Sequence, residues 1–318
     1  MVRDVCIHAR GISVYRGIDE MNSRPIVNAL SVDVEEYFQV SAFESVIETS
    51  QWEKWPPRVE FATGRLLDLF AESGVHATFF TLGWVAERYP LLLRRMVDEG
   101  HEVGCHGLQH VRITAQTPEQ FREDLKRSKE LIEDAAGVMV RGYRAASFSI
   151  SRANLWAYEE IAAAGFQYSS SVYPVHHDIY GIPEAPRVPF RPPVTPGITE
   201  IPISTVKIGS RNLPAGGGGY FRLLPYAISR ALIRRVNRID NVAANMYFHP
   251  WEFDPEQPRP TGLPLKSQFR HYINQQRSLP RLRRLLEDFS WGTFAQVYAA
   301  AIAGQCDMNA GRELFASS

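Results

Sequence analysis

The sequence has little cysteine and no excess of charge of either sign. Cys6, Cys105 and Cys306 are its three cysteines, and their irregular spacing fits neither a disulfide framework nor a zinc-ribbon pattern. A reducing compartment is therefore expected. Lys plus Arg and Asp plus Glu both total 35, so the formal net charge is zero. This balance predicts no broad electrostatic attraction to nucleic acid or anionic lipid.

A long apolar run is also absent. No stretch reaches the roughly 18 uninterrupted apolar residues of a membrane span. Charged residues occur throughout the first 20 positions, so the N-terminal segment lacks the apolar core of a signal peptide. These features predict a cytoplasmic protein without a membrane span, which could also lie at the inner membrane face.

Strands and helices are expected to alternate along most of the chain. Apolar residues make up 45% of the sequence and charged residues 22%, which is enough to bury a sizeable core. The alternation predicts parallel strands with helices outside, either in a barrel or in an open doubly wound sheet. We favour a barrel. The expected strands are 26–34, 76–83, 102–104, 140–150, 167–174 and, as the last, 241–253; the expected helices are 58–75, 90–100, 118–137, 154–166, 224–238 and 278–289.

The composition also predicts how the chain is divided. Residues 1–24 are polar and irregular, and we expect a peripheral segment in which Met21 is an alternative start to Met1. Residues 25–298 are expected to form a single domain, followed by a C-terminal tail at 299–318. Many prolines and four consecutive glycines, 216–219, mark residues 181–225 as an extended insertion on the rim with a flexible tip.

Acidic residues follow the first expected strand. The segment SVDVEEYF contains Asp33, Glu35 and Glu36. On an extended backbone Asp33 and Glu35 point to one side and Glu36 to the other. Because the carboxyl ends of parallel strands meet on one face, the first two could share a site. Two carboxylates at a suitable separation could also serve a glycosidase.

Two histidines follow a later strand at i and i+4. The segment GCHGLQHV contains His106 and His110, a spacing that can present both imidazoles to one cation. Gly107 stands where a zinc peptidase of the H-E-x-x-H type needs a glutamate, so that class is disfavoured. A carboxylate with two neutral imidazoles leaves positions open for water and substrate, as in a catalytic metal site.

Two more strand ends carry ionisable residues. Arg144 lies in RGYRAASFSI and offers a permanently charged donor that could hold a carboxylate. His249 ends an apolar strand in MYFHPWEF, beside Pro250 and Trp251. Taken alone, Arg144 is equally consistent with a surface ion pair, whereas a single histidine such as His249 more often has a structural role.

Together, the segments SVDVEE, HGLQH, YRAASFS and YFHPWE resemble, in order and spacing, the polysaccharide deacetylases of carbohydrate esterase family four, the NodB-homology group. The resemblance runs from about Asn28 to Val297. DVEEYFQVSAF, SSSVYPVHHDIYGIPEAPR and HPWEFDPEQPR resemble the subgroup found in exopolysaccharide and exosortase-associated gene loci. The resemblance implies an α/β fold, a distorted (β/α) barrel with about seven strand-helix units, together with a divalent metal and hydrolysis of an acetamide.

The resemblance also implies roles for individual residues. Asp33 matches the catalytic base, Arg144 the residue that orients this base, and His249 the catalytic acid. His106 and His110 match metal ligands.

Three positions depart from the family pattern. Val34 stands where the usual third ligand, an aspartate, is found, so Glu35 is expected to be the third ligand with Glu36 in reserve. Ala146 replaces a proline of the arginine motif, and Ser169 replaces a common aspartate. Neither of these two changes removes a proton-transfer group.

The expected activity is metal-dependent removal of N-acetyl groups from amino sugars of a polysaccharide or its precursor. Zn²⁺ is the expected metal, with Co²⁺ or another divalent ion as alternatives, and an N-acetylated glycan is the expected partner. Trp251, and less strongly Trp84 or Tyr220, are expected to stack on a sugar ring. The alternatives are a carbon-nitrogen hydrolase of the same superfamily acting on a small amide or cyclic ureide, and a glycan-binding relative without turnover.

Overall fold

The computed structural model describes residues 25–178, 180–194 and 197–305. The expected peripheral segment, residues 1–24, therefore lies outside the described residues, as do residues 306–318 of the expected tail. No helix in the described ranges is both long enough and apolar enough to cross a membrane.

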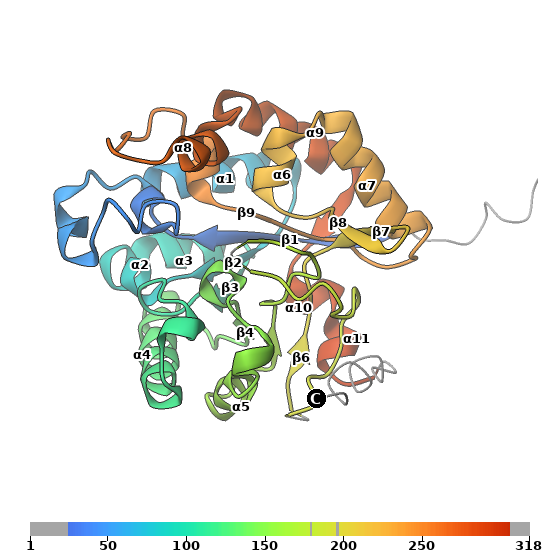
Figure 1. The fold of residues 1–318 in the computed structure, drawn as a ribbon, viewed down its shortest axis with the longest axis horizontal. Coiled ribbons are helices and arrows are strands. Elements are labelled where there is room, and N and C mark those ends of the chain that lie inside the picture. The colour runs from blue at the N-terminus through green and yellow to red at the C-terminus, as the bar shows by residue number, and fades with distance from the viewer. Residues whose placement is uncertain (1–24, 179, 195–196, 306–318) are drawn as a thin grey trace, which may run out of the picture.

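A curled, all-parallel sheet forms the centre of the fold (Figure 1). The strand order is β10-β1-β2-β3-β4-β5-β6, with β9 also paired to β1. The strands are β1 (Val27–Val34), β2 (Thr78–Thr81), β3 (Glu102–Cys105), β4 (Gly142–Tyr143), β5 (Tyr168–Ser169), β6 (Thr199–Glu200), β9 (Asn245–Phe248) and β10 (Ser290–Gly292).

Strand β1 is the axis of this sheet because three strands pair with it. Ala29 pairs with Asn245 of β9 and with Gly292 of β10, so these two strands lie on opposite edges of β1. Strand β2 pairs with β1 from Ser31 to Val34, on the same edge as β10 but beyond the point where β10 ends. Because β2 and β10 follow one another along this edge, the eight strands occupy seven positions across the curled sheet. The expected distorted barrel of about seven units is confirmed.

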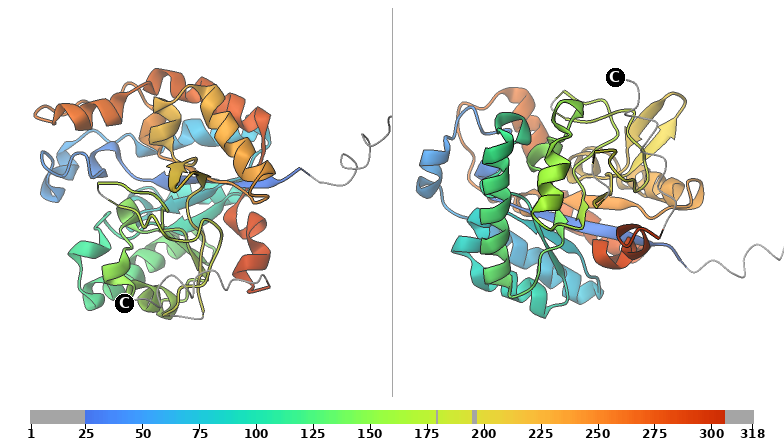
Figure 2. Two further views of the ribbon diagram at one scale, coloured as in Figure 1. Left: turned by 45° about the vertical axis from the view of Figure 1, so that its right-hand side comes forward. Right: turned by 90° about the horizontal axis from the view of Figure 1, so that it is seen from below.

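Helices cover the outside of the sheet (Figures 1 and 2). Helices α1 and α4 end at Gly74 and Gly137, where positive φ angles of 62° and 72° favour glycine. The helices are α1 (Val59–Ser73), α2 (Gly83–Arg88), α3 (Pro90–Asp98), α4 (Pro118–Ala136), α5 (Ala157–Ala163), α6 (Gly218–Leu223), α7 (Tyr226–Arg238), α8 (Leu265–Tyr272), α9 (Ser278–Asp288), α10 (Phe294–Val297) and α11 (Ala299–Ile302). Short 3-10 turns occupy 37–39, 49–54, 113–115, 146–148, 152–154, 250–253 and 275–277.

The segment 181–225 differs from the expected rim insertion. It supplies β6 to the main sheet and an antiparallel hairpin, β7 (Thr205–Ile208) with β8 (Arg211–Pro214). Gly216, Gly217 and Gly218 are buried. A Cβ at Gly218 would lie 1.6 Å from Glu252 Oε2. The expectation of a flexible tip is wrong, because these glycines allow a close approach of backbone and side chain.

The C-terminal end of the domain also differs from expectation. Residues 241–253 do not hold the last strand, because β10 pairs with the start of β1. At three residues, β10 is too short to produce a periodic pattern. Part of the expected tail is packed as α11, where Ala301 is buried and its carbonyl accepts a hydrogen bond from Thr199 Oγ1 at 3.2 Å.

Candidate active site

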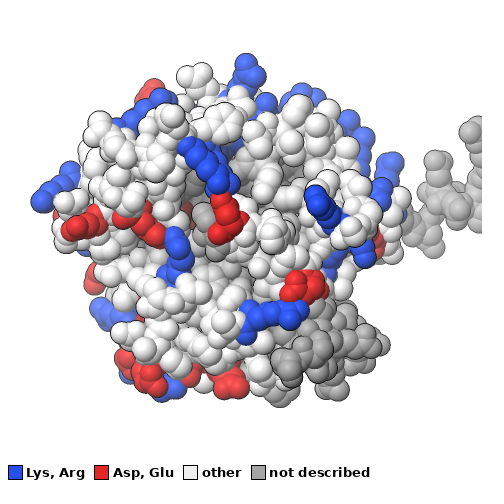
Figure 3. Space-filling view, viewed as in Figure 1, with Lys and Arg blue, Asp and Glu red and all other residues white. Residues whose placement is uncertain are grey.

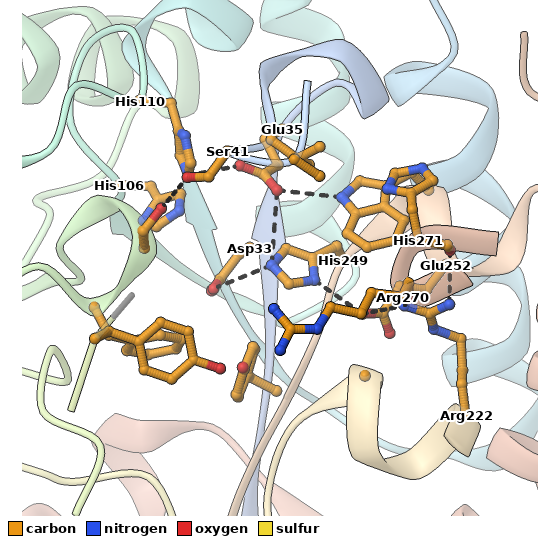
Figure 4. Close-up of a pocket in the computed structure, with 18 residues that line it drawn as sticks. Asp33, Glu35, Ser41, His106, His110, Arg222, His249, Glu252, Arg270 and His271 are labelled. Atoms are coloured by element: carbon orange, nitrogen blue, oxygen red, sulfur yellow. Dashed lines mark hydrogen bonds and ion pairs between the residues drawn. The ribbon is translucent and has the colours of Figure 1, made fainter. Parts of the chain in front are cut away.

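The carboxyl ends of several strands converge on one cavity of about 210 Å³ (Figure 4). Asp33 lies in β1, and Glu35 follows one residue after its end. His106 follows β3 and His249 follows β9, and all four side chains line the cavity. Arg144 follows β4 and lies behind Asp33. The residues selected from strand ends in the sequence therefore meet in space.

Glu35, His106 and His110 form a cluster of donor atoms. Their ligand atoms lie within 4.8 Å of one another, and all three residues are buried. His110 Nε2 lies 2.9 Å from Glu35 Oε2. His106 Nδ1 lies 2.8 Å from the carbonyl oxygen of Arg144. A carbonyl only accepts, so this ring carries its proton on Nδ1 and leaves Nε2 free to bind a cation.

The charge states in this cluster suit a divalent metal. Burial raises the pKa of Glu35, but the interaction with His110, including its hydrogen bond, and the nearby His249 and His106 outweigh this effect. The net pKa of Glu35 is about 2, so its carboxyl group is ionised. Burial lowers the pKa of His106 to about 4, so its imidazole is neutral. His110 Nδ1 is buried without a hydrogen-bond partner among the described residues. One carboxylate and two imidazoles are a donor set that Zn²⁺ favours.

Glu36 lies outside this cluster. Its Oε1 accepts hydrogen bonds from the backbone N–H groups of Arg58 and Val59, at 2.8 and 3.0 Å. These donors are at the start of α1, where a helix leaves its first N–H groups without partners inside the helix. Glu36 therefore closes the N-terminal end of α1, and Glu35 alone of the two glutamates faces the histidines.

Replacement of Glu36 by alanine is expected to lower the free energy of unfolding by about 1–2 kcal/mol, the usual cost of a lost helix cap. Metal content should stay at the wild-type value. Glu36→Gln is the matched control, since its amide oxygen can still accept from both N–H groups. Urea unfolding and metal analysis of both variants provide the test. Loss of metal in Glu36→Ala without loss of stability would contradict the assignment.

Asp33 is held by a buried guanidinium. Arg144 Nη1 donates to Asp33 Oδ1 at 2.6 Å and lies 2.9 Å from Ser31 Oγ. On its other side, Arg144 donates to the backbone oxygen and the hydroxyl of Ser170, each at 3.0 Å. Both charged side chains are essentially inaccessible to solvent. These contacts fix the direction of the Asp33 carboxylate and leave its Oδ2 toward His249.

His249 is oriented by a carboxylate three residues further on. Its Nδ1 lies 3.0 Å from Glu252 Oε1, and its Nε2 lies 3.6 Å from Glu35 Oε1 and 3.9 Å from Asp33 Oδ2. Glu252 in turn lies 3.8 Å from the buried guanidinium of Arg222. Burial lowers the pKa of His249, but the hydrogen bond to Glu252 and the charges of the surrounding carboxylates outweigh this effect. The net pKa of His249 is raised to about 9. The protonated ring is therefore favoured.

Strained backbone accompanies the cavity. His110, Ser147 and Phe148 have φ angles of 57°, 53° and 50°, which are unfavourable for residues with a side chain, and all three line the cavity. Ser147 is tethered by its hydroxyl, 2.6 Å from that of Ser41. The loop that has Ala146 in place of a proline is thus held in place across the site.

The predicted sugar-stacking residues occupy three different environments. Trp251 lies at the cavity, but it is buried, and the imidazoles of His249 and His271 stack on it with ring centroids 4.9 and 4.1 Å away. Trp84 is buried in the core instead, with Arg88 over its ring at 4.0 Å. These two expectations therefore lack the free ring face that stacking needs. Tyr220 is half-buried and lines an adjoining chamber.

Family models match most of the chain in two parts. Residues 53–168 match the model described as polysaccharide deacetylase. Residues 170–299 match a separate model, described as a domain of unknown function, DUF3473. His106, His110 and Arg144 fall in the deacetylase part and His249 in the second part, whereas Asp33 precedes both.

Individual relatives agree with the deacetylase match. A peptidoglycan deacetylase of Helicobacter pylori is 35% identical over 119 residues, covering 37% of this chain and 39% of that protein. A chitooligosaccharide deacetylase of Rhizobium leguminosarum bv. trifolii is 41% identical over 73 residues, covering 23% of this chain and 34% of that protein. The chain thus spans about two fifths or less of the length of these relatives.

A solved structure shares the whole fold. A Mycobacterium smegmatis protein whose name assigns it to the polysaccharide deacetylases has a TM-score of 0.58 and 19% identity. The similarity covers 89% of this chain and 94% of that chain. At this coverage the similarity extends over both matched parts, so the DUF3473 part belongs to the same shared fold.

Proposed function

We propose that this protein is a metal-dependent deacetylase that removes N-acetyl groups from amino sugars of a polysaccharide or its precursor. One observation carries the proposal: the donor cluster of Glu35, His106 and His110 shares a cavity with an oriented carboxylate, Asp33, and an oriented imidazole, His249. The names of the relatives support N-acetylated glycans as substrates. Several motifs resemble the subgroup found in exopolysaccharide gene loci, so the proposal includes a role in exopolysaccharide biosynthesis or modification.

Glu35, His106 and His110 would hold the metal, with Zn²⁺ as the preferred ion. When bound, a divalent cation there would polarise the acetamide oxygen and make water a better nucleophile at neutral pH.

Asp33 and His249 each carry out one of the two proton transfers in the proposed reaction. Asp33 is placed to take a proton from the attacking water as its oxygen bonds to the acetamide carbon, while Arg144 keeps the carboxylate aimed. His249, held at Nδ1 by Glu252, presents Nε2 to the cavity and protonates the sugar nitrogen as the carbon-nitrogen bond breaks. The products are acetate and a free amine. A cavity that only bound a glycan would not require this acid-base pair.

The direct test measures acetate release. Metal-reconstituted protein should release acetate from N-acetylated oligosaccharides or nucleotide sugars, and removal of metal by a chelator should abolish the release.

His106→Ala and His110→Ala should each lose tight metal binding, because one of three protein ligands is gone. Metal analysis after dialysis measures this loss.

Two results would contradict the proposal. Full metal binding without acetate from any substrate would favour the glycan-binding alternative. Wild-type metal stoichiometry in both histidine variants would place the metal elsewhere.

A further inference from the structure

The loop that carries the two ligand histidines is not helical. Residues 106–110 form neither a helix nor a strand, so no helical hydrogen-bond pattern fixes the spacing of His106 and His110. Gly107 and His110 have φ angles of 85° and 57°, whereas a right-handed helix needs a negative φ. The relative position of the two imidazoles therefore depends on contacts between this loop and the rest of the protein.

Helix α2 holds the loop by its carbonyl groups. The backbone N–H of Gly83 donates a hydrogen bond to the carbonyl oxygen of Gly107 at 2.9 Å. The backbone N–H of Trp84 donates to the carbonyl oxygen of Leu108, also at 2.9 Å. Both donors belong to the first turn of α2, where an N–H group has no acceptor inside the helix. One side of the loop is thus fixed to α2.

The side chain of Asp124 holds the same loop from α4. Its Oδ1 accepts a hydrogen bond from the backbone N–H of Leu108 at 3.1 Å. This N–H and the carbonyl of Gly107 belong to one planar peptide group. That group is therefore bound at both ends, at its oxygen by Gly83 and at its N–H by Asp124. It cannot turn without breaking a hydrogen bond, and it lies in the chain between the two histidines.

Close packing brings α2, α4 and the loop together. A Cβ at Gly83 would lie 3.0 Å from the Cα of Ser128, so the backbones of α2 and α4 approach closely at this point. A Cβ at Gly107 would lie 3.2 Å from Asp124 Oδ1. Glycine at 107 thus permits both the positive φ and the approach of the loop to the carboxylate.

Asp124 differs from the charged residues around it on α4. Glu123, Lys126 and Arg127 are exposed, as expected for the solvated face of an amphipathic helix. Acidic and basic side chains are interspersed at the lower left of Figure 3, where α4 reaches the surface. Asp124 is instead half-buried and contacts the loop. Solvation of the helix surface therefore does not account for an aspartate at this position.

We propose that Asp124 is a positioning residue for the metal site. By fixing the peptide group between Gly107 and Leu108, it keeps the two ligand histidines directed at one ion before the ion binds. The inference rests on the proposed function for the identity of the metal ligands. Asp124 acts through the loop backbone and lies outside the cluster of donor atoms.

Zn²⁺ affinity measures this role directly, by competition between the metal-free protein and a chromophoric chelator. Asp124→Ala removes the acceptor and should weaken Zn²⁺ binding by about tenfold or more, the scale for groups that orient a metal ligand. Asp124→Asn keeps an oxygen that can accept from Leu108, so its affinity should stay near the wild-type value. Glu123→Ala is the matched control, because Glu123 is the exposed neighbour of Asp124 on the same helix.

Two further measurements separate positioning from simple stabilisation. The visible absorption of bound Co²⁺ depends on the arrangement of its ligands, so Asp124→Ala should change this spectrum and Asp124→Asn should retain it. Urea unfolding of the metal-free variants measures the contribution to folding. A residue that only stabilised the fold would lower the urea midpoint in Asp124→Ala and leave the Zn²⁺ affinity and the Co²⁺ spectrum of the folded protein unchanged.

Gly107→Ala tests the same contact without altering α4. Its Cβ would press against Asp124 Oδ1 and would disfavour the positive φ, so Zn²⁺ affinity should fall here too.

Wild-type Zn²⁺ affinity in both Asp124→Ala and Gly107→Ala would overturn the inference and leave the proposed function untouched. Equal losses of affinity in Asp124→Ala and Asp124→Asn would also overturn it, because the asparagine retains the acceptor. Zn²⁺ binding that is weakened in Asp124→Ala and retained in Asp124→Asn, without acetate from any substrate, would instead refute the proposed activity and leave the positioning role standing.

Discussion

Asp33→Asn is expected to lower acetate release by about 10²-fold or more, the usual scale for loss of a general base, while bound metal stays at the wild-type stoichiometry. The asparagine oxygen can still accept the 2.6 Å hydrogen bond that Arg144 Nη1 donates to Asp33 Oδ1. The shape of the site is therefore retained, but an amide cannot take a proton from water. Steady-state kinetics and metal analysis of the same preparation measure the two effects separately.

The control for this experiment is Glu35→Gln. Glu35 belongs to the donor cluster, so its neutral variant should lose metal affinity first and should recover part of its activity in excess metal. Glu36→Gln should keep its metal, because Glu36 faces the start of α1. Full turnover in Asp33→Asn would require a different mechanism. Loss of metal in Glu36→Gln but not in Glu35→Gln would show only that the ligand assignment is wrong.

The groups at the strand ends could be predicted from the sequence because their arrangement follows from the topology of the sheet. Parallel strands place their carboxyl ends on one face, so Asp33, His106 and His249 converge once their strands are recognised. The two-residue period of a strand separates Glu35 from Glu36, and the structure has them on different sides, one facing His110 and the other facing α1.

Groups that act through tertiary contacts could not be found in this way. Glu252 is visible in the sequence three residues after His249, a spacing that could have indicated a contact, but its approach to Arg222 depends on the packing of α6. The indole of Trp251 is stacked against His249 and against His271, which lies on α8. A tryptophan two residues after a histidine gives no sign in the sequence of how much of its ring remains accessible.

Short strands escaped prediction for a related reason. Strands β6 and β10 have two and three residues. Unlike the equally short β4 and β5, they lie outside the longer apolar segments expected to be strands, and their place in the sheet is set by neighbours far away in sequence. The glycines at 216–218 were misread because glycine permits both flexible chain and close packing. Only the contact of Gly218 with Glu252 separates these two uses.

The largest effect on stability is expected at Arg144. Its side chain and that of Asp33 are buried, and Arg144 also contacts Ser31 and Ser170. Arg144→Met keeps an unbranched side chain of moderate size but leaves the Asp33 carboxylate buried without its guanidinium. Breaking one side of a buried ion pair costs about 3–5 kcal/mol, so the free energy of unfolding should fall by that amount, and turnover should fall because the base is no longer aimed. Urea unfolding of the metal-free protein measures the stability change.

A double variant separates the ion pair from simple packing. In Asp33→Asn/Arg144→Met no buried charge is left without a partner, so the double variant should be more stable than Arg144→Met alone, although it carries one more substitution. If Arg144 served mainly to fill space beside Phe80, over which its guanidinium lies at 4.2 Å, the two costs would add and the double variant would be the least stable of the set. A gain in stability from adding Asp33→Asn, with turnover still lost, would identify Arg144 as the group that allows a buried base to exist at this strand end.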